Sequence, residues 1–273
     1  MQAVFMSYLP ESPKWLIQNG MEMKGRAALQ LALDTDEAVE SRYREIVDSH
    51  HHSNDVTSDF KEAFKNVTYE YRAVFACIAV LMFFQQFTGG VVVRNYAPVI
   101  FKNAGFGEKA SLTFTVVLGV VKVVAVGWSI YNVDLVGRKK LLLLGLTVMT
   151  CGQVTLFVAF AVGYGQNIGV FVVGCSMILG GFSIGLGPVT WLLQSEMFPT
   201  IIRGRAMGLS VVTRNLSEFM VNFAFLPLVD TIHDAGTFFF FFTMCVCALL
   251  FTRTFIVETK QKEPPEILSD FEK

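Results

Sequence analysis

The chain has 273 residues, of which 53% are hydrophobic and only 16% are charged, whereas ordinary soluble domains contain about 25% charged residues. Residues 141–195 contain no Asp, Glu, Lys or Arg. Since a membrane-spanning helix needs only about 20 apolar residues, this segment has room for two spans and argues against a soluble fold. The net charge of -1 argues against a nucleic-acid partner.

The five cysteines all lie within apolar runs, and free cysteine packs as a small hydrophobic side chain. We therefore expect no disulfide framework. Cys245 and Cys247 form a Cys-x-Cys pair that is also compatible with a soft metal, but no second pair lies near it in the sequence. Packing is the favoured interpretation, and we predict no cofactor.

The first part of the chain, residues 1–71, is rich in charge and should lie mostly in water. Residues 1–8 lack the basic start of a signal peptide and resemble the end of a membrane helix. Residues 22–32 and 36–47 carry apolar side chains at spacings of three and four, which predicts two amphipathic helices. Residues 49–58 predict a solvated loop, and the alternative is that its three consecutive histidines bind a metal.

Apolar runs long enough to cross a membrane follow. Glycines at residues 89–90 interrupt the first run, and Gly185, Gly187 and Pro188 interrupt the fourth. Such breaks persist in membranes where the freed backbone groups face protein or water, so both are candidate binding segments. We predict an all-α membrane protein with six transmembrane helices within residues 72–257. The predicted spans are residues 73–93, 110–132, 141–163, 168–194, 206–229 and 236–257.

Basic loops indicate the orientation of these spans. Residues 138–140 and 203–205 carry basic side chains two spans apart, whereas residues 163–167 contain no Lys or Arg. Because cytosolic loops are enriched in Lys and Arg, the basic loops should be cytosolic. The leading segment and the tail, residues 258–273, then lie in the cytosol as well.

Six short motifs occur at residues 10–15, 85–89, 134–139, 185–191, 196–205 and 257–260. In order and spacing they resemble the motifs of sugar porters of the major facilitator superfamily. The resemblance covers nearly the whole chain but maps only onto the cytosolic linker and the last six helices of a twelve-helix carrier. It implies that a first six-helix half is missing. Residues 117–122, 133–138 and 223–228 are most similar to the plant vacuolar glucose transporter and D-xylose-proton symporter-like branch.

Gln85 and Gln86 are candidate ligands for a sugar. Sugar hydroxyls both donate and accept hydrogen bonds, so a sugar site needs neutral polar side chains with both capacities. Two adjacent amides within an apolar span are unfavourable unless they find partners. Contact with a ligand is the favoured interpretation, and hydrogen bonding between helices is the alternative. The resemblance implies that both side chains bind the sugar.

The resemblance also implies that Trp191 packs against the sugar ring and that Gly187 belongs to the wall of the site, although a lone Trp is also compatible with core packing. The sequence departs from the family at several positions, including Arg214 and Glu218, where the family has neutral polar residues. Val91 replaces an amide donor, Lys122 stands where many members have a binding asparagine, and Asn215 takes the place of an aromatic residue. These departures leave the identity of the substrate open.

Charges within the spans give a further set of candidates. A cation as deep as Lys122 is unfavourable unless it meets water, ligand or a carboxylate. Arg214 and Glu218 lie one turn apart and can neutralise each other. We favour a static ion pair, and the alternatives are a proton-coupling role for Glu218 or a pair with Lys122. Arg94 is expected near the outer mouth. The extra cations also permit an anionic substrate, such as a sugar acid or phosphorylated sugar.

A second group of charges matches the family's cytosolic salt-bridge network. Ion pairs at the helix ends, each worth about 1 kcal/mol or less, suit a reversible gate at the inner mouth. The alternative is ordinary anchoring by positive charge. The expected gate residues are Glu11, Asp134, Arg138, Glu196, Arg203 and Glu258.

These observations predict a multi-pass membrane protein of the plasma membrane or a vacuolar or other organellar membrane, and not an enzyme. The expected function is transport of a glucose-like or xylose-like monosaccharide by alternating access, with protons as a candidate second substrate. Its expected partners are the sugar, the bilayer and a first six-helix half or a full-length carrier. The alternatives are a non-transporting sugar-sensing or regulatory fragment and a carrier of an anionic sugar derivative.

Overall fold

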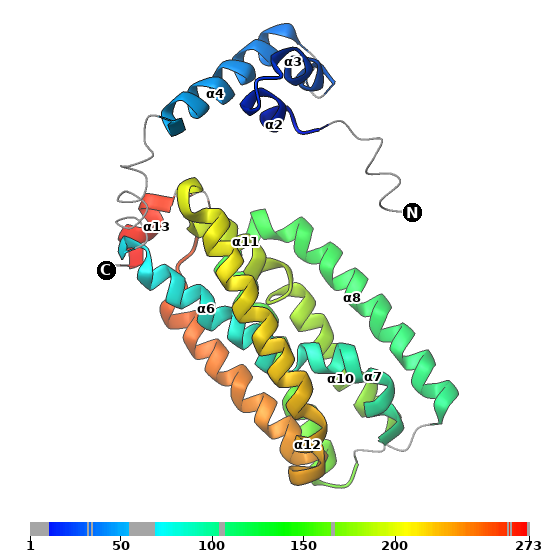
Figure 1. Cartoon of the computed structure of the whole chain (residues 1–273). Helices are drawn as coiled ribbons and strands as arrows, with labels where there is room; N and C mark the ends of the chain where they lie inside the picture. Colours follow the sequence, from blue (N-terminus) through cyan, green and yellow to red (C-terminus); the bar gives the residue numbers. More distant parts are fainter. Residues whose placement is uncertain are drawn as a thin grey trace. The chain divides into compact units, whose positions relative to one another are not determined.

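The computed structural model describes residues 11–31, 33, 35–54, 69–103, 107–164, 167–260, 262 and 264–271. Within these residues the chain is helical and contains no strand. It forms two compact units, residues 1–67 and 68–273. The all-α fold predicted from the sequence is therefore confirmed (Figure 1).

The first unit contains α2 (Pro13–Gln18), α3 (Glu22–Gln30) and α4 (Asp36–Asn54). The helices predicted at residues 22–32 and 36–47 are present, and their apolar sides meet in a small core. The predicted loop at residues 49–58 is wrong as far as residue 54, because no glycine or proline ends α4 before that point. Residues 1–8 lie outside the described part of the chain. The core consists of Ile17, Leu29, Val39, Tyr43 and Ile46.

The second unit contains the apolar helices. Five helical stretches of the described residues are long and apolar enough to cross a membrane: Arg72–Tyr96, Lys109–Val136, Arg138–Ala161, Ile168–Met197 and Ile202–Phe255. The helices of this unit are α6 (Arg72–Phe87), α7 (Gly90–Asn103), α8 (Glu108–Val136), α9 (Arg138–Ala161), α10 (Ile168–Ile184), α11 (Pro188–Met197), α12 (Thr200–Phe255) and α13 (Pro264–Phe271).

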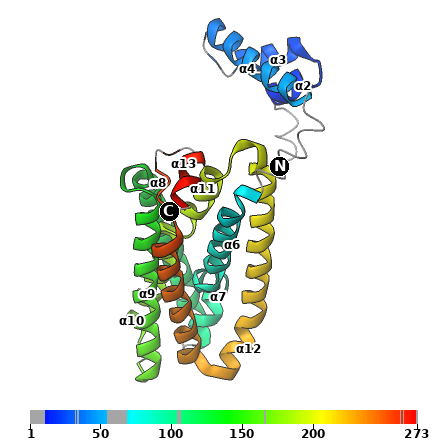
Figure 2. The same ribbon diagram turned by 90° about the vertical axis from the view of Figure 1, so that its left-hand side faces the viewer.

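The long helix α12 contains the last two predicted spans. His233 interrupts it with φ 59° and ψ 175°, outside helical values. Figure 2 shows the ribbon running along the bundle and then turning back on itself. The two arms on either side of His233 therefore correspond to the spans predicted at residues 206–229 and 236–257. Within α12, His233 is the residue with non-helical backbone angles, and it lies between these two predicted spans.

The first predicted break separates α6 from α7. Gly89 has φ +84°, and a Cβ atom there would lie 2.8 Å from Nε2 of Gln153 and 2.9 Å from Cγ of Phe241. The backbone carbonyl of Thr88 accepts hydrogen bonds from Gln153 Nε2, at 3.0 Å, and from Cys245 Sγ, at 3.5 Å. Side chains of α9 and α12 thus satisfy a carbonyl that the break frees, as an apolar environment requires.

The second predicted break separates α10 from α11. The carbonyl of Ile184 accepts a hydrogen bond from Ser129 of α8, at 2.7 Å. The carbonyl of Leu186 accepts one from Gln85 of α6, also at 2.7 Å, and one from Thr190 within α11. The break is thereby connected to two other helices, and both discontinuities predicted from the glycines are confirmed.

Helices α9 and α10 pack closely against each other at glycine residues, which have no side chain. A Cβ atom on Gly145 would lie 2.5 Å from the carbonyl oxygen of Gly181 and 2.8 Å from Cα of Gly185. Since these obstacles are backbone atoms, no side-chain movement would relieve the clash. Small residues allow such close approach of membrane helices, where packing replaces the hydrophobic effect as the driving force.

The cysteines are distributed between the interior and the outer faces of the bundle. Cys77, Cys175 and Cys245 are buried, as predicted, whereas Cys151 and Cys247 are exposed. The expectation of burial was wrong for these two because an apolar face of a membrane helix can point outward to lipid. Residues two apart on a helix point in different directions, so Cys245 and Cys247 do not converge as metal ligands would.

We expect Gly145→Ala to lower the thermal unfolding temperature of the detergent-solubilised protein, because the added methyl group overpacks the α9–α10 contact, at a cost of about 1–3 kcal/mol. Circular dichroism would follow the unfolding. Gly119→Ala is the matched control, since nothing lies within 4 Å of a Cβ at that position of α8. Equal unfolding temperatures for the two variants would contradict the packing argument.

Candidate functional site

The second unit encloses a cavity of about 270 Å³, close to the lower end of the range of about 300–1,000 Å³ for ligand sites. Both discontinuous spans contribute to its wall. Residues from α6, α7, α8, α10 and the first arm of α12 line it, together with the segment that joins α10 to α11 and with α11 itself. The predicted site residues Gln85, Gln86, Gly187, Trp191 and Lys122 all line this cavity.

The two glutamines have different hydrogen bonds. Gln85 donates from Nε2 to the carbonyl of Leu186, so its amide group fastens α6 to the break before α11. Gln86 donates to Oε1 of Gln85 at 3.2 Å. Its own Oε1 atom is buried and has no hydrogen-bond partner among the described residues. The helix-to-helix alternative therefore describes Gln85, whereas Gln86 retains an unused acceptor at the cavity.

Ser183 is a cavity residue that the sequence did not single out. It is 2% exposed and lines the cavity from the end of α10. Its Oγ atom, like Oε1 of Gln86, lacks a hydrogen-bond partner in the described part of the chain. A buried polar atom without a partner is unfavourable unless a ligand or water satisfies it. A serine two residues before Gly185, at the start of the glycine-rich break, was the available signal.

Part of the cavity lining is apolar. Phe182 and Val126 line it together with Pro188 and Trp191 of α11. Trp191 is 38% exposed, so its ring is not fully packed into the core. The guanidinium carbon of Arg214 lies 5.7 Å from the centroid of this ring, within the distance for a cation–π interaction. The cavity thus combines an aromatic face, unpaired polar atoms and positive charge.

Glu218 lies between two arginines. Arg214 Nη2 is 2.8 Å from Glu218 Oε2, and Arg94 Nη2 is 3.1 Å from Glu218 Oε1. The ion pair expected within α12 is present, but Arg94 of α7 is a second partner that the sequence placed only near the outer mouth. Lys122 is exposed and makes no ion pair with any residue that the structure describes.

Asn215 and Val91, two of the residues at which the sequence departs from the family pattern, do not line the cavity. Asn215 is exposed and accepts a hydrogen bond from Nη1 of Arg214, at 2.7 Å, so it orients a cavity side chain without lining the cavity. Val91 is fully buried in the protein. Hydrogen bonds from Asn95 to Asn222 and from Tyr96 to the carbonyl of Asn222 add to the connection between α7 and α12.

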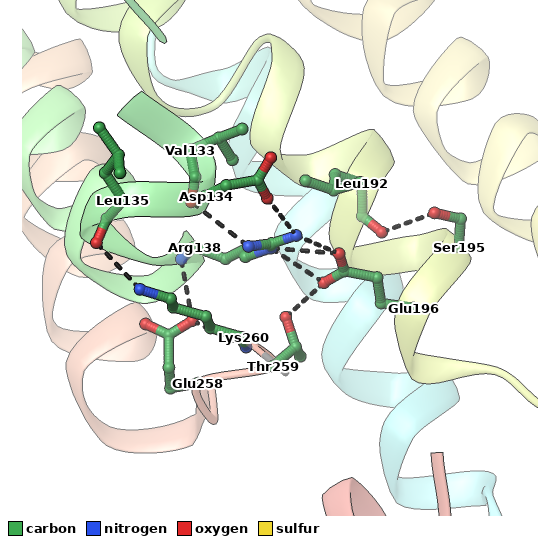
Figure 3. Close-up of polar contacts among 10 residues, drawn as sticks. All are labelled: Val133, Asp134, Leu135, Arg138, Leu192, Ser195, Glu196, Glu258, Thr259 and Lys260. Atoms are coloured by element: carbon green, nitrogen blue, oxygen red, sulfur yellow. Dashed lines mark hydrogen bonds and ion pairs between the residues drawn. The ribbon is translucent and has the colours of Figure 1, made fainter. Parts of the chain in front are cut away.

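A second cluster of charges joins the ends of α8, α9 and α11 (Figure 3). Arg138 is 11% exposed and pairs with Glu196, Nη2 to Oε1, at 2.7 Å. It also pairs with Asp134, which is 79% exposed, at 3.0 Å. Thr259 donates to the second carboxylate oxygen of Glu196 at 2.5 Å. Of the two carboxylates that pair with Arg138, that of Glu196 is therefore mostly shielded from solvent and that of Asp134 is not.

Glu258 caps the start of α9. Its carboxylate accepts hydrogen bonds from the backbone N–H groups of Arg138, at 2.8 Å, and Lys139, at 3.1 Å. A helix begins with unsatisfied N–H groups and a partial positive charge, so an acidic cap is favourable there. Gly137 precedes the helix with φ +97°, and a Cβ atom there would lie 2.7 Å from the Glu258 carboxylate.

Arg203 and Glu11 do not contribute described ion pairs to this cluster. Arg203 donates from Nε to the carbonyl of Phe198 at 3.0 Å and thereby fixes the turn between α11 and α12. Glu11 belongs to the first unit, and its place in a cytosolic gate stays a prediction. Within the described residues, no group of three or more His, Cys, Asp or Glu side chains is arranged to hold a metal ion.

We expect Glu196→Gln to destabilise the protein by about 2 kcal/mol, because it removes charged hydrogen bonds from a mostly buried arginine. Asp134→Asn should cost less than about 1 kcal/mol, because that carboxylate is exposed. Thermal unfolding in detergent would measure both effects. If the Asp134 variant were the less stable of the two, the unequal roles of the carboxylates would be refuted.

Comparison with known proteins gives one consistent result. The sequence matches the family described as "Sugar (and other) transporter" over residues 1–271. Sugar transport protein MST2 of Oryza sativa subsp. japonica is 34% identical over 270 residues, which cover 94% of this chain and 51% of that protein. Glucose transporter GlcP of Staphylococcus epidermidis is 29% identical over 95% of this chain and 57% of its own.

Solved structures agree with these sequence matches. The proton:xylose symporter XylE, a major facilitator protein solved with 6-bromo-6-deoxy-D-glucose, superposes with a TM-score of 0.76 at 29% identity. The match covers 98% of this chain and 55% of XylE. The chain thus spans about half the length of the curated relatives it matches. The resemblance predicted from the six motifs is confirmed, and the half coverage fits the C-terminal half of the fold.

Proposed function

Because the chain belongs to the sugar transporter family, as a multi-pass, all-α membrane protein, we propose that it forms the C-terminal half of a monosaccharide carrier that works by alternating access. In this proposal residues 72–257 are the transmembrane bundle. Residues 1–71 comprise the end of a preceding membrane helix and a cytosolic linker, and residues 258–273 are a cytosolic tail. The relatives are transporters by name, and the chemistry of the cavity requires no covalent step.

The unpaired polar atoms of the cavity carry the proposal. Gln86 and Ser183 line a cavity large enough for a small ligand, and their Oε1 and Oγ atoms are buried and lack partners in the described structure. A sugar hydroxyl can donate to either atom, and Ser183 can also donate in return. Trp191 offers the flat apolar face on which a pyranose ring packs. Gly187 leaves room beside that ring.

The two helix breaks support the proposal that one wall of the cavity moves during transport. Discontinuous helices at the binding site are typical of carriers in which one half rocks against the other. In a whole carrier the opposite wall would come from a first six-helix half. We further propose that the cluster around Arg138 and Glu196, with Asp134 and Glu258, closes the cytosolic mouth. Glu11 and Arg203 would join it in one of the two states.

A glucose-like or xylose-like monosaccharide is the proposed substrate, since GlcP is named a glucose transporter and XylE a proton:xylose symporter. Proton coupling would need a carboxylate that changes its partners during transport. Glu218 is the candidate, because it is 24% exposed and shared by two arginines on different helices. Protonation of Glu218 would release α7 from α12 at this point.

Binding of radiolabelled glucose and xylose to the purified chain in detergent tests the site. Gln86→Leu and Ser183→Ala should each weaken binding by about five- to tenfold, because each removes one hydrogen bond worth about 1 kcal/mol. Ser210→Ala is the matched control: this serine is 4% exposed, bonds to the carbonyl of Ala206 and does not line the cavity. Absence of any sugar binding would refute the proposed function.

Uptake by a transport-deficient cell tests the carrier role. The chain would be expressed alone and together with the first six-helix half of a related sugar porter. We expect uptake of labelled sugar only when both halves are present. Sugar binding without uptake in either case would favour a non-transporting, sugar-sensing role.

A further inference from the structure

We propose that the cavity selects a sugar bearing an anionic group, a carboxylate or a phosphate, over the neutral sugar. This inference rests on the proposed function, because it concerns the substrate of the same cavity. Arg94, Lys122 and Arg214 line the cavity, and no acidic side chain is among its described lining residues. Glu218 does not line the cavity but pairs with both arginines. Three cations are therefore matched by one anion, which leaves an excess of two positive charges.

The side chain of Lys122 is too short to reach the water at either end of α8. It is the middle residue of α8, 14 positions from Glu108 and 14 from Val136, or about 21 Å from either end at 1.5 Å per residue. That distance is far beyond the reach of a lysine side chain. An unpaired ammonium at this depth is unfavourable unless water or an anion accompanies it. The cavity is where that anion can bind.

Arg214 is positioned to recognise a substituent on a stacked sugar. Its guanidinium carbon lies 5.7 Å from the centroid of the Trp191 ring, and both residues line the cavity, so a sugar bound there lies within reach of this cation. Guanidinium groups bind carboxylate and phosphate through paired hydrogen bonds. Asn215 already accepts from Nη1, at 2.7 Å, and holds the side chain toward the cavity.

Glu218 is the internal competitor for this ligand. It occupies one nitrogen of Arg94 and one of Arg214, the same groups that an anionic substituent would use. Binding of the ligand and pairing with Glu218 are therefore opposed. Removing the charge of Glu218 should strengthen binding of the anion, whereas removing Lys122 should weaken it. A purely structural ion-pair network predicts no such opposite effects.

Fluorescence of Trp191 provides the measurement. The protein has three tryptophans, so Trp15→Phe and Trp128→Phe leave the cavity residue as the single reporter in the purified full chain. Glucuronate, glucose 6-phosphate and glucose would be titrated at low and high salt. We expect at least one of the two anionic sugars to bind at least tenfold more tightly than glucose at low salt. This preference should fall with added salt, and comparison of the two anions shows which group is preferred.

Charge variants distinguish binding at the cavity from nonspecific binding of anions. Lys122→Gln should reduce the preference for the anionic sugar over glucose by about tenfold, and Glu218→Gln should increase it. Lys109→Gln, at an exposed position of the same helix, is the control and should change neither. Circular dichroism confirms that each variant is folded. Because Lys122 is exposed, its replacement leaves the packed core intact.

The outcomes are distinct. If glucose binds as tightly as both anionic sugars, or if Lys122→Gln and Lys109→Gln behave alike, the anionic preference is refuted while the sugar site stands. If none of the three sugars changes the fluorescence or competes with a labelled sugar, both the preference and the proposed function are refuted.

Discussion

Backbone carbonyls freed by two helix breaks are the constraint on which the bundle depends. In an apolar environment these groups need hydrogen-bond donors from the protein. Gln153 supplies one to Thr88, while Ser129 and Gln85 supply others at the second break. Each donor comes from a different helix from the one that breaks. The hydrogen bonds that satisfy the breaks therefore also fix which helices are neighbours.

The same constraint produces the cavity. Gln85 is committed to the carbonyl of Leu186, so it holds the break open toward α6 and cannot serve fully as a ligand donor. Gln86, the next residue, lines the cavity and keeps an acceptor oxygen, Oε1, without a hydrogen-bond partner among the described residues. Close contact between α9 and α10 through glycine supports the segment from behind. Close backbone contacts thus support a cavity lined by Gln86 and Ser183, whose Oε1 and Oγ atoms have no hydrogen-bond partner among the described residues.

Much of this arrangement was predictable from local patterns. The glycine positions predicted both breaks, and hydropathy predicted the spans, because helix interruption and membrane length are properties of short segments. The division of labour between Gln85 and Gln86 was not predictable, since it depends on which carbonyl lies opposite. The pairing of Arg94 with Glu218 was not predicted for a similar reason: the two residues are 124 positions apart in the chain. Glu196 was assigned correctly to the charged cluster, whereas the turn contact of Arg203 depends on local backbone geometry.

The cap on α9 has a consequence for the order of assembly. Glu258 and Thr259 belong to the extended segment after α12, and they bind the start of α9 and the end of α11. A ribosome makes these two residues about 120 positions after Arg138. The first N–H groups of α9 therefore lack this cap until α12 has been synthesised. The contact can form only when the chain from α9 to Thr259 is present.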